Sequence, residues 1–279
     1  MSADASTTGL AFTDALDAAV GEAAAALREA AFAVALTGAG LSVESGIPPF
    51  RGPGGLWTKY GEPPLDGYQR FLRDPVKAWR ERLHPTEPWA RGLQETLAAA
   101  RPNAAHLALA ELERRGLLGC TITQNIDDLH RQAGSRALLE IHGNHRWLRC
   151  VECHERFDPA RFEVDPERLP PRCPGCDGVV KGDTVHFGEP IPPRVLRACY
   201  EAVERADCML LIGTSGTVYP AAEFPFEVLR RGGTVIEVNP YESDLTPLVS
   251  LSLRGPAGAV MQRLLERALA AAPARRAHA

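Results

Sequence analysis

The sequence predicts an α/β fold in which a doubly wound parallel sheet carries a smaller part formed by a helical insertion and a zinc-binding insertion. Short apolar runs that end in glycine or polar residues alternate with amphipathic helical segments, as in a parallel sheet with crossover helices. Two regions, 52–102 and 146–181, interrupt this alternation. A length of 279 residues and a hydrophobic content of 45% are sufficient for a large core.

The first predicted element is a helix over residues 13–31, which are rich in Ala, Leu, Glu and Arg and begin with a Thr and an Asp that can cap a helix. Five apolar runs then read as buried strands, within residues 31–40, 118–127, 135–143, 206–216 and 232–240. Helical segments over 103–116 and 220–233 lie between them. This order is typical of a doubly wound sheet.

The two interrupting regions differ in composition. Residues 52–102 contain many prolines together with Trp57, Tyr60 and Tyr68, which predicts a looped, partly helical insertion. Residues 146–181 carry paired cysteines. The predicted organisation is therefore a main domain over 13–51, 103–145 and 182–270, a helical insertion over 52–102, a zinc-binding insertion over 146–181 and a disordered polar tail over 271–279.

The cysteine pairs predict a structural zinc site. Cys150 and Cys153 form one C-x-x-C pair, Cys173 and Cys176 form another, and nineteen residues separate the pairs. Four thiolates occupy all four coordination positions of a tetrahedral zinc ion and leave none for a catalytic water. Disulfides or chance cysteines are the alternative. The other three cysteines, Cys120, Cys199 and Cys208, stand in apolar contexts and are expected to be buried, inert thiols.

The overall charge argues against some classes of partner. Thirty-one basic and 35 acidic residues give a net charge of −4, so nucleic acid and anionic membranes are not expected partners. The loop between the cysteine pairs mixes acids and bases without clustered aromatics, which argues against a nucleic-acid-binding zinc ribbon. The beginning of the chain has no signal-peptide pattern and no stretch is long and apolar enough to span a membrane. Paired, metal-spaced thiols suit a reducing compartment, and we expect a cytoplasmic protein.

The stretch "GAGLSVESGIPPFRG" at 38–52 raises a choice between a phosphate cradle and a flexible turn. Gly38 and Gly40 follow a strand and precede a helix start, where backbone amides can face a diphosphate, but an ordinary glycine turn has the same pattern. Arg51 adds a bidentate donor for phosphate or ribose oxygens. The "GTSG" turn at 213–216 would open into the same crevice, which favours the cradle.

Polar residues follow two further strands. Gln124, Asn125 and Asp127 lie in "TQNIDDLH", where burial leaves polar groups unpaired unless a ligand binds them. A helix cap explains Asp127 alone but not all three. His142, in "EIHGNH", is at another strand end; a lone histidine can be structural, but this position favours a catalytic role.

The chain resembles the sirtuin family of NAD-dependent protein lysine deacylases. The motifs "GAGLSVESGIPPFRG", "TQNIDDLH", "EIHG", the two C-x-x-C pairs, "GDTVHFGEP", "GTSGTVYPA" and "VNP" occur in the family's order over nearly the whole chain. The resemblance implies a Rossmann-like large domain, a small domain made from the two insertions, and NAD and acyl-lysine bound between them. The expected products are deacylated lysine, nicotinamide and O-acyl-ADP-ribose.

Carried over motif by motif, the resemblance also implies roles for single residues. The cofactor-binding residues would be Gly38, Ala39, Gly40, Ser42, Phe50 and Arg51 in the first loop, Gln124 and Asn125 beside the nicotinamide ribose, Ile126 and Asp127 at the carboxamide, Gly213, Thr214 and Ser215 at the diphosphate and adenosine side, and Asn239 at the adenosine ribose. His142 would be the general base. The backbone of Val185, His186, Phe187, Gly188 and Glu189 would pair with an extended acyl-lysine peptide.

The sequence departs from the family pattern at a few positions. Pro49 replaces a frequent aspartate, and Gly182 and Thr184 replace a usual proline and valine. Members that prefer acidic acyl groups carry a Tyr and an Arg three apart; here Trp79 and Arg82 have that spacing, so we expect neutral acyl groups. Arg82 is alternatively a contact for an acidic acyl chain or a solvated charge. ADP-ribosyl transfer on the same scaffold and a non-catalytic nucleotide sensor are the alternative functions, and the oligomeric state stays open.

Overall fold

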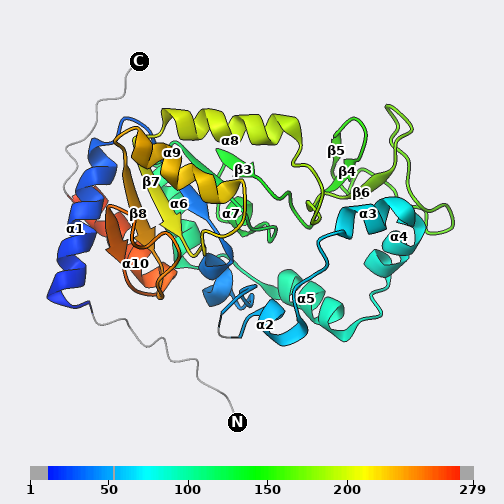
Figure 1. Ribbon diagram of the computed structural model, residues 1–279, viewed down its shortest axis with the longest axis horizontal. Coiled ribbons are helices and arrows are strands. Elements are labelled where there is room, and N and C mark those ends of the chain that lie inside the picture. Colours follow the sequence, from blue (N-terminus) through cyan, green and yellow to red (C-terminus); the bar gives the residue numbers. More distant parts are fainter. Residues whose placement is uncertain (1–11, 53, 271–279) are drawn as a thin grey trace, which may run out of the picture.

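The computed structural model describes residues 12–52 and 54–270, and its centre is a six-stranded parallel sheet (Figure 1). The strand order is β3-β2-β1-β7-β8-β9. Every neighbouring pair in this sheet is parallel. The strands are β1 (Ala33–Thr37), β2 (Cys120–Thr123), β3 (Leu138–Glu140), β7 (Cys208–Ile212), β8 (Thr234–Val238) and β9 (Leu251–Leu253). The five predicted strands are confirmed, and β9 is an addition.

Helices cover both faces of the sheet, because alternate residues of each buried strand point to opposite faces. Ala35 and Leu210 pack with the helices of one face, whereas Val34 and Leu211 pack with those of the other. The first face carries α1 (Asp14–Glu29), α6 (Ala104–Arg114) and α10 (Ala257–Ala270), and the second carries α8 (Pro193–Arg205) and α9 (Phe224–Arg230) (Figure 1). The doubly wound α/β prediction is therefore confirmed.

Caps define where two of these helices begin. The Thr13 hydroxyl accepts a hydrogen bond from the Leu16 amide at 3.2 Å, as predicted for the start of α1. Asn103 caps α6 by accepting from the Ala105 amide at 2.9 Å, and His106 completes a capping box. No helix in the described part of the chain has the length and apolar character of a membrane span.

The first insertion is more helical than predicted. It contains α2 (Leu56–Tyr60), α3 (Gly67–Arg73), α4 (Pro75–Leu83) and α5 (Pro88–Ala99). Pro75 and Pro88 occupy the first positions of α4 and α5. An amide hydrogen is not needed at that position and the fixed φ of proline suits it, so these prolines start helices instead of marking loops.

The second insertion contains a small antiparallel sheet of order β5-β4-β6, formed by β4 (Leu148–Cys150), β5 (Arg156–Phe157) and β6 (Val180–Gly182). Trp79 of α4 packs against Leu148, is 3% exposed and donates its indole hydrogen to the Val180 carbonyl at 2.7 Å. The two insertions therefore share a core, at the end of the molecule far from α1 (Figure 1). Strand β6 crosses the predicted boundary at 181/182, and the predicted tail over 271–279 lies outside the described residues.

Candidate active site

The carboxyl ends of five parallel strands meet at one edge of the large sheet. The segments that follow β1, β2, β3, β7 and β8 begin near Gly38, Gln124, His142, Gly213 and Asn239. The chain leaves β1 toward β2 and β3 on one side, while β7 and β8 lie on the other. The strand order thus reverses between β1 and β7, and α/β proteins bind ligands at such a switch point.

The two glycine loops are in direct contact at this point. The Gly38 amide donates to the Ile212 carbonyl at 3.0 Å, and the Gly40 amide donates to the Gly213 carbonyl at 2.8 Å. A Cβ on Gly38 would lie 2.8 Å from the Gly213 oxygen, so a larger residue would push the loops apart. These two amides are therefore already bonded. The glycines bring the loops together, and the helix η1 (Ala39–Ser45) starts at their junction.

A buried polar network lies next to this junction. The Ser42 hydroxyl donates to Asp127 Oδ2 at 2.7 Å, and Asn125 Nδ2 donates to the Gly38 carbonyl at 3.0 Å. Burial raises the pKa of the Asp127 carboxyl, while the Ser42 bond opposes that rise. Asp127 Oδ1 also accepts from the Leu129 amide at 3.0 Å, just before α7 (Leu129–Gln132), so the capping explanation accounts for one of its two oxygens.

Thr214 connects the other strand ends. Gln124 Nε2 donates to Thr214 Oγ1 at 3.0 Å, and Asn239 Nδ2 donates to the Thr214 carbonyl at 3.2 Å. Ser215 is bonded to Thr217 through their hydroxyls at 2.8 Å. The structure thus brings the predicted residues of β2, β7 and β8 into one hydrogen-bonded group. Ile126 lies apart from it and accepts from the His145 amide at 2.9 Å.

His142 is half-buried, and its Nδ1 lies 3.1 Å from the Gln124 carbonyl oxygen. Because a carbonyl only accepts, Nδ1 carries the proton and the neutral ring keeps Nε2 as its basic nitrogen. Burial lowers the pKa of His142 below its ordinary value of 6.5, and the bond to Gln124 opposes this only in part. The ring is therefore neutral, and able to accept a proton, at neutral pH.

The backbone around His142 is fixed by residues of the adjoining segment. The Val185 amide donates to the His142 carbonyl at 2.9 Å, and the Asn144 amide donates to Asp183 Oδ2 at 3.0 Å. Gly143 has φ of +75°, and a Cβ there would overlap the Asp183 carbonyl. Only glycine fits this turn.

Asp183 belongs to a buried ionic network that the sequence did not indicate. It is fully buried and pairs with Arg149 at 2.5 Å and Arg156 at 2.8 Å. Arg156 also pairs with Glu140 at 2.7 Å, and Asn144 Nδ2 donates to Glu140 at 2.6 Å. The network joins β3, the turn after His142 and the cysteine-bearing sheet. Its members come from motifs that look unrelated in sequence, so spacing gave no signal.

The predicted peptide-binding segment is a turn. The Glu189 amide donates to the His186 carbonyl at 3.0 Å, the His186 amide donates to the Glu189 carboxylate at 2.8 Å, and Gly188 has φ of +78°. The Phe187 carbonyl accepts from the Tyr68 amide of α3 at 2.9 Å. Within the described residues, the Val185 carbonyl and the Phe187 amide have no hydrogen-bond partner, so they remain available to pair with a peptide.

Phe50 and Arg51 lie on the loop before α2. Phe50 is 38% exposed and packs against Trp57 with the two rings tilted by 37°. Arg51 pairs with Glu62 at 3.3 Å and donates to Thr217 Oγ1 at 3.1 Å, so its guanidinium stands beside the loop that follows β7.

Two cavities are lined by other residues. One, of about 670 Å³, is lined by Leu83, His84, Pro85, Thr86, Arg91, Gln94 and Glu95. The other, of about 470 Å³, is lined by Leu97, Ala98, Arg101, Gln132, His145 and Arg146. Neither contains a residue predicted to bind cofactor or peptide. The strand-end residues instead bond to one another, as described above.

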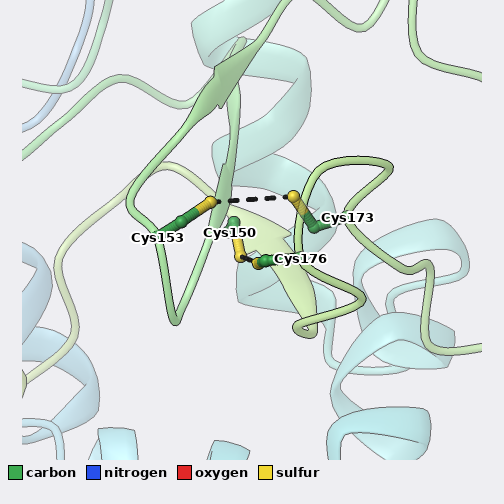
Figure 2. Close-up of side chains that lie close together, drawn as sticks. All are labelled: Cys150, Cys153, Cys173 and Cys176. Carbon is green, nitrogen blue, oxygen red and sulfur yellow. Dashed lines mark hydrogen bonds between the residues drawn. The ribbon is translucent and has the colours of Figure 1, made fainter.

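The four paired cysteines gather as predicted (Figure 2). Their sulfurs all lie within 4.8 Å of one another, with 3.5 Å between Cys150 and Cys176 and 3.7 Å between Cys153 and Cys173. Zn–S bonds of about 2.3 Å in a tetrahedron separate sulfurs by about 3.8 Å, so the cluster fits zinc. Cys120, Cys199 and Cys208 are buried free thiols elsewhere, as expected.

Comparison with known proteins gives the family. The model of the Sir2 family, the sirtuins, matches residues 38–220. This chain is a sirtuin. It is 46% identical over 252 residues to an NAD-dependent protein deacylase of Thermococcus kodakarensis, covering 89% of this chain and 95% of that one.

Solved sirtuin structures agree with the fold. A Sir2 homologue in complex with NAD aligns with a TM-score of 0.74 and 44% identity, covering 90% of this chain and 94% of that one. A Sir2 structure with a deacetylated peptide and 3'-O-acetyl ADP-ribose aligns with a TM-score of 0.70 and 34% identity, covering 88% and 96%. The resemblance stated from the motifs is confirmed.

One departure of this sirtuin from the family pattern has a structural explanation. A Cβ on Gly182 would lie 2.5 Å from Arg82 Nη1. Arg82 also donates from Nη2 to the His145 carbonyl at 3.0 Å, and burial lowers the pKa of its guanidinium. The Arg82 side chain therefore occupies the space that a side chain at position 182 would need.

Proposed function

We propose that this sirtuin is an NAD-dependent protein lysine deacylase, most simply a deacetylase, which converts acyl-lysine, NAD and water to lysine, nicotinamide and O-acyl-ADP-ribose. The observation that carries the proposal is the neutral His142 ring, held by the Gln124 carbonyl at the edge where the cofactor loops meet. The curated relative is named a deacylase, which favours deacylation over ADP-ribosyl transfer or nucleotide sensing.

The residues proposed to hold NAD are those that the motifs indicated. They are Gly38, Ala39, Gly40, Ser42, Phe50, Arg51, Gln124, Asn125, Ile126, Asp127, Gly213, Thr214, Ser215 and Asn239. Bound NAD supplies an electrophilic ribose carbon that loses nicotinamide as the acyl oxygen attacks. His142 Nε2 then accepts the proton of a ribose hydroxyl. Asn125 and Asp127, which are 7% and 4% exposed, help to exclude water from the reacting centre.

The substrate proposed is an extended peptide that carries acyl-lysine. Val185, His186, Phe187, Gly188 and Glu189 form its docking segment, and the unpaired Val185 carbonyl and Phe187 amide offer main-chain bonds. We propose a neutral acyl group. Trp79 is buried in the core shared by the insertions and Arg82 packs on Gly182, which leaves neither free to receive a carboxylate.

We propose that residues 13–51, 103–145 and 182–270 form the NAD-binding domain; all six strands of the large sheet fall within these ranges. A cytoplasmic location is supported by the four clustered thiols, which require reducing conditions to remain available for zinc and not form disulfides.

One assay tests the function. The protein is incubated with labelled NAD and acetyl-, succinyl- or longer-acyl-lysine peptides, and both peptide mass and label transfer are followed. We expect loss of the acetyl mass with label in O-acetyl-ADP-ribose. His142→Ala should lower this rate at least about 100-fold while NAD still binds.

The exposed His84, which directly follows α4, provides the matched control, because His84→Ala should keep the wild-type rate. Nicotinamide release without any change in an acyl peptide would contradict the proposal, and label on protein side chains would favour ADP-ribosyl transfer.

A further inference from the structure

One aromatic ring contacts both the cofactor loop and the peptide segment. Trp57, in α2, has its ring centroid 5.2 Å from that of Phe50 and 5.7 Å from that of Phe187. The Arg51 guanidinium lies 4.3 Å from the centroid of the same ring. Trp57 therefore bridges two residues assigned to NAD and one assigned to the peptide.

The backbone on each side of this bridge is fixed. The Leu56 and Trp57 amides donate to the Pro49 and Phe50 carbonyls at 2.8 and 2.9 Å, so α2 starts directly on the cofactor loop. On the peptide side, the Phe187 carbonyl accepts from α3 as described above. If the cofactor loop or the peptide segment is displaced, the Trp57 ring must move with it or lose its contact. The backbone beside the ring has little freedom to compensate.

The two rings that contact Trp57, those of Phe50 and Phe187, keep an exposed surface that a ligand can contact. Phe50 is 38% exposed and Phe187 is 36% exposed, whereas Trp57 between them is half-buried. A peptide along residues 185–189 would cover Phe187 and restrict its motion. The restriction reaches Phe50 and Arg51 through the indole, so the cofactor loop would lose less conformational entropy when NAD binds afterward.

We infer that Trp57 is a positioning residue that couples the two substrates: an acyl-lysine peptide bound at residues 185–189 raises the affinity of the cofactor loop for NAD through the contacts of Trp57 with Phe187 and Phe50. This inference rests on the proposed function of the two segments. Coupling of binding free energies is reciprocal, so NAD raises peptide affinity by the same factor.

The test measures binding without turnover. Calorimetry gives the Kd of carba-NAD, an NAD isostere that cannot expel nicotinamide, with and without saturating acetyl-lysine peptide. In the wild type, we expect the peptide to lower this Kd at least about fivefold. Trp57→Leu should reduce the factor to below about twofold, and Trp57→Phe should retain part of it because a smaller ring keeps some contact.

Trp89→Leu is the matched control. Trp89 lies on α5 of the same insertion and is 45% exposed, so the same chemical change should leave the coupling factor unchanged. Thermal unfolding and zinc content show whether each variant folds. If Trp57→Leu does not fold, Phe187→Leu removes the same contact from the peptide side and should also reduce the factor.

An unchanged coupling factor in a folded Trp57→Leu variant would overturn the inference, as would a wild-type protein in which peptide leaves the Kd of carba-NAD unaltered. Either result is compatible with normal deacylation of the acetyl peptide. Failure of the proposed function is recognised separately, by a wild type that leaves every acyl peptide unmodified.

Discussion

At the scale of single residues, the proposed catalysis depends on one ring, that of His142, whose two nitrogens have different roles. The Gln124 carbonyl holds the proton on His142 Nδ1, and burial keeps the ring uncharged by lowering its pKa. A histidine free in solvent would be partly protonated near neutral pH and would sample both tautomers. The fold therefore supplies the protonation state that a general base needs before any substrate binds.

This protonation state predicts the pH dependence of the reaction. A group with a lowered pKa is protonated only at a pH below that value, so the base stays active as pH falls through 6.5, the ordinary histidine value. We expect kcat/KM for the acetyl peptide to fall on the acid side with a midpoint below pH 6.5. Initial rates from about pH 8 to pH 5 check the prediction. A midpoint at or above pH 6.5 would contradict it, and the residual rate of His142→Ala should not show this acid-side fall.

At the scale of elements, the turn after β3 connects the large sheet to the cysteine-bearing insertion and fixes the position of His142. Gly143 is required there for two separable reasons, its positive φ and the close approach of the Asp183 carbonyl. Displacing a catalytic group by about 1 Å costs roughly 100-fold in rate. The turn therefore affects activity more than its size suggests.

Comparing substitutions at Gly134 and Gly143 separates the effect of positive φ from that of the close contact, and Gly92, which has neither feature, is the control. Gly134 has φ of +103° with open space around it, so Gly134→Ala should lose only about 1 kcal/mol of stability. Gly143→Ala should lose at least about 2 kcal/mol more and should abolish most activity. Gly92 lies within α5 in open space, and Gly92→Ala should gain about 0.5–1 kcal/mol. Urea unfolding and peptide assays measure all three; equal losses for Gly134→Ala and Gly143→Ala would contradict the overlap argument.

The sequence was informative where structure is local. Apolar runs located β1, β2, β3, β7 and β8, but β9 has only three residues and a polar centre, Ser252, whose hydroxyl bonds to the buried Glu237 at 3.3 Å. The prolines of the first insertion predict loops, although two of them start α4 and α5. Motifs at strand ends predict the proposed site residues, whereas Asp183 and Arg149 lie 34 positions apart and no sequence pattern relates them. Likewise, no sequence pattern relates Trp57 to Phe187, which contacts it in the structure.

At the scale of the whole molecule, two cores have different sources of stability. The apolar clusters on the two faces of the large sheet are stabilised by packing between the sheet and its helices. The small core instead contains Cys150 and Cys173 beside Trp79. A core of this size gains much of its stability from a bound metal. Arg149 and Arg156 connect that core to the turn after His142 through Asp183.

Zinc removal should therefore affect activity before it affects the sheet. We expect one zinc per chain by elemental analysis, and chelation should abolish deacylation while most far-ultraviolet circular dichroism remains. Zinc contributes on the order of 10 kcal/mol in small structural sites, so the insertion should unfold without it. Cys150→Ser should lose the metal, and Cys199→Ala, which changes a buried thiol outside the cluster, should keep it. A zinc-free protein with full activity would contradict this account.

The bond between the Trp79 indole and the Val180 carbonyl joins positions 101 residues apart. During synthesis, Trp79 leaves the ribosome long before the strand that covers it has been made. At about 5–20 residues per second, the delay is roughly 5–20 s. A nascent chain of this sirtuin consequently displays a large bare indole on α4 for that interval, which a chaperone can bind until β6 has been made.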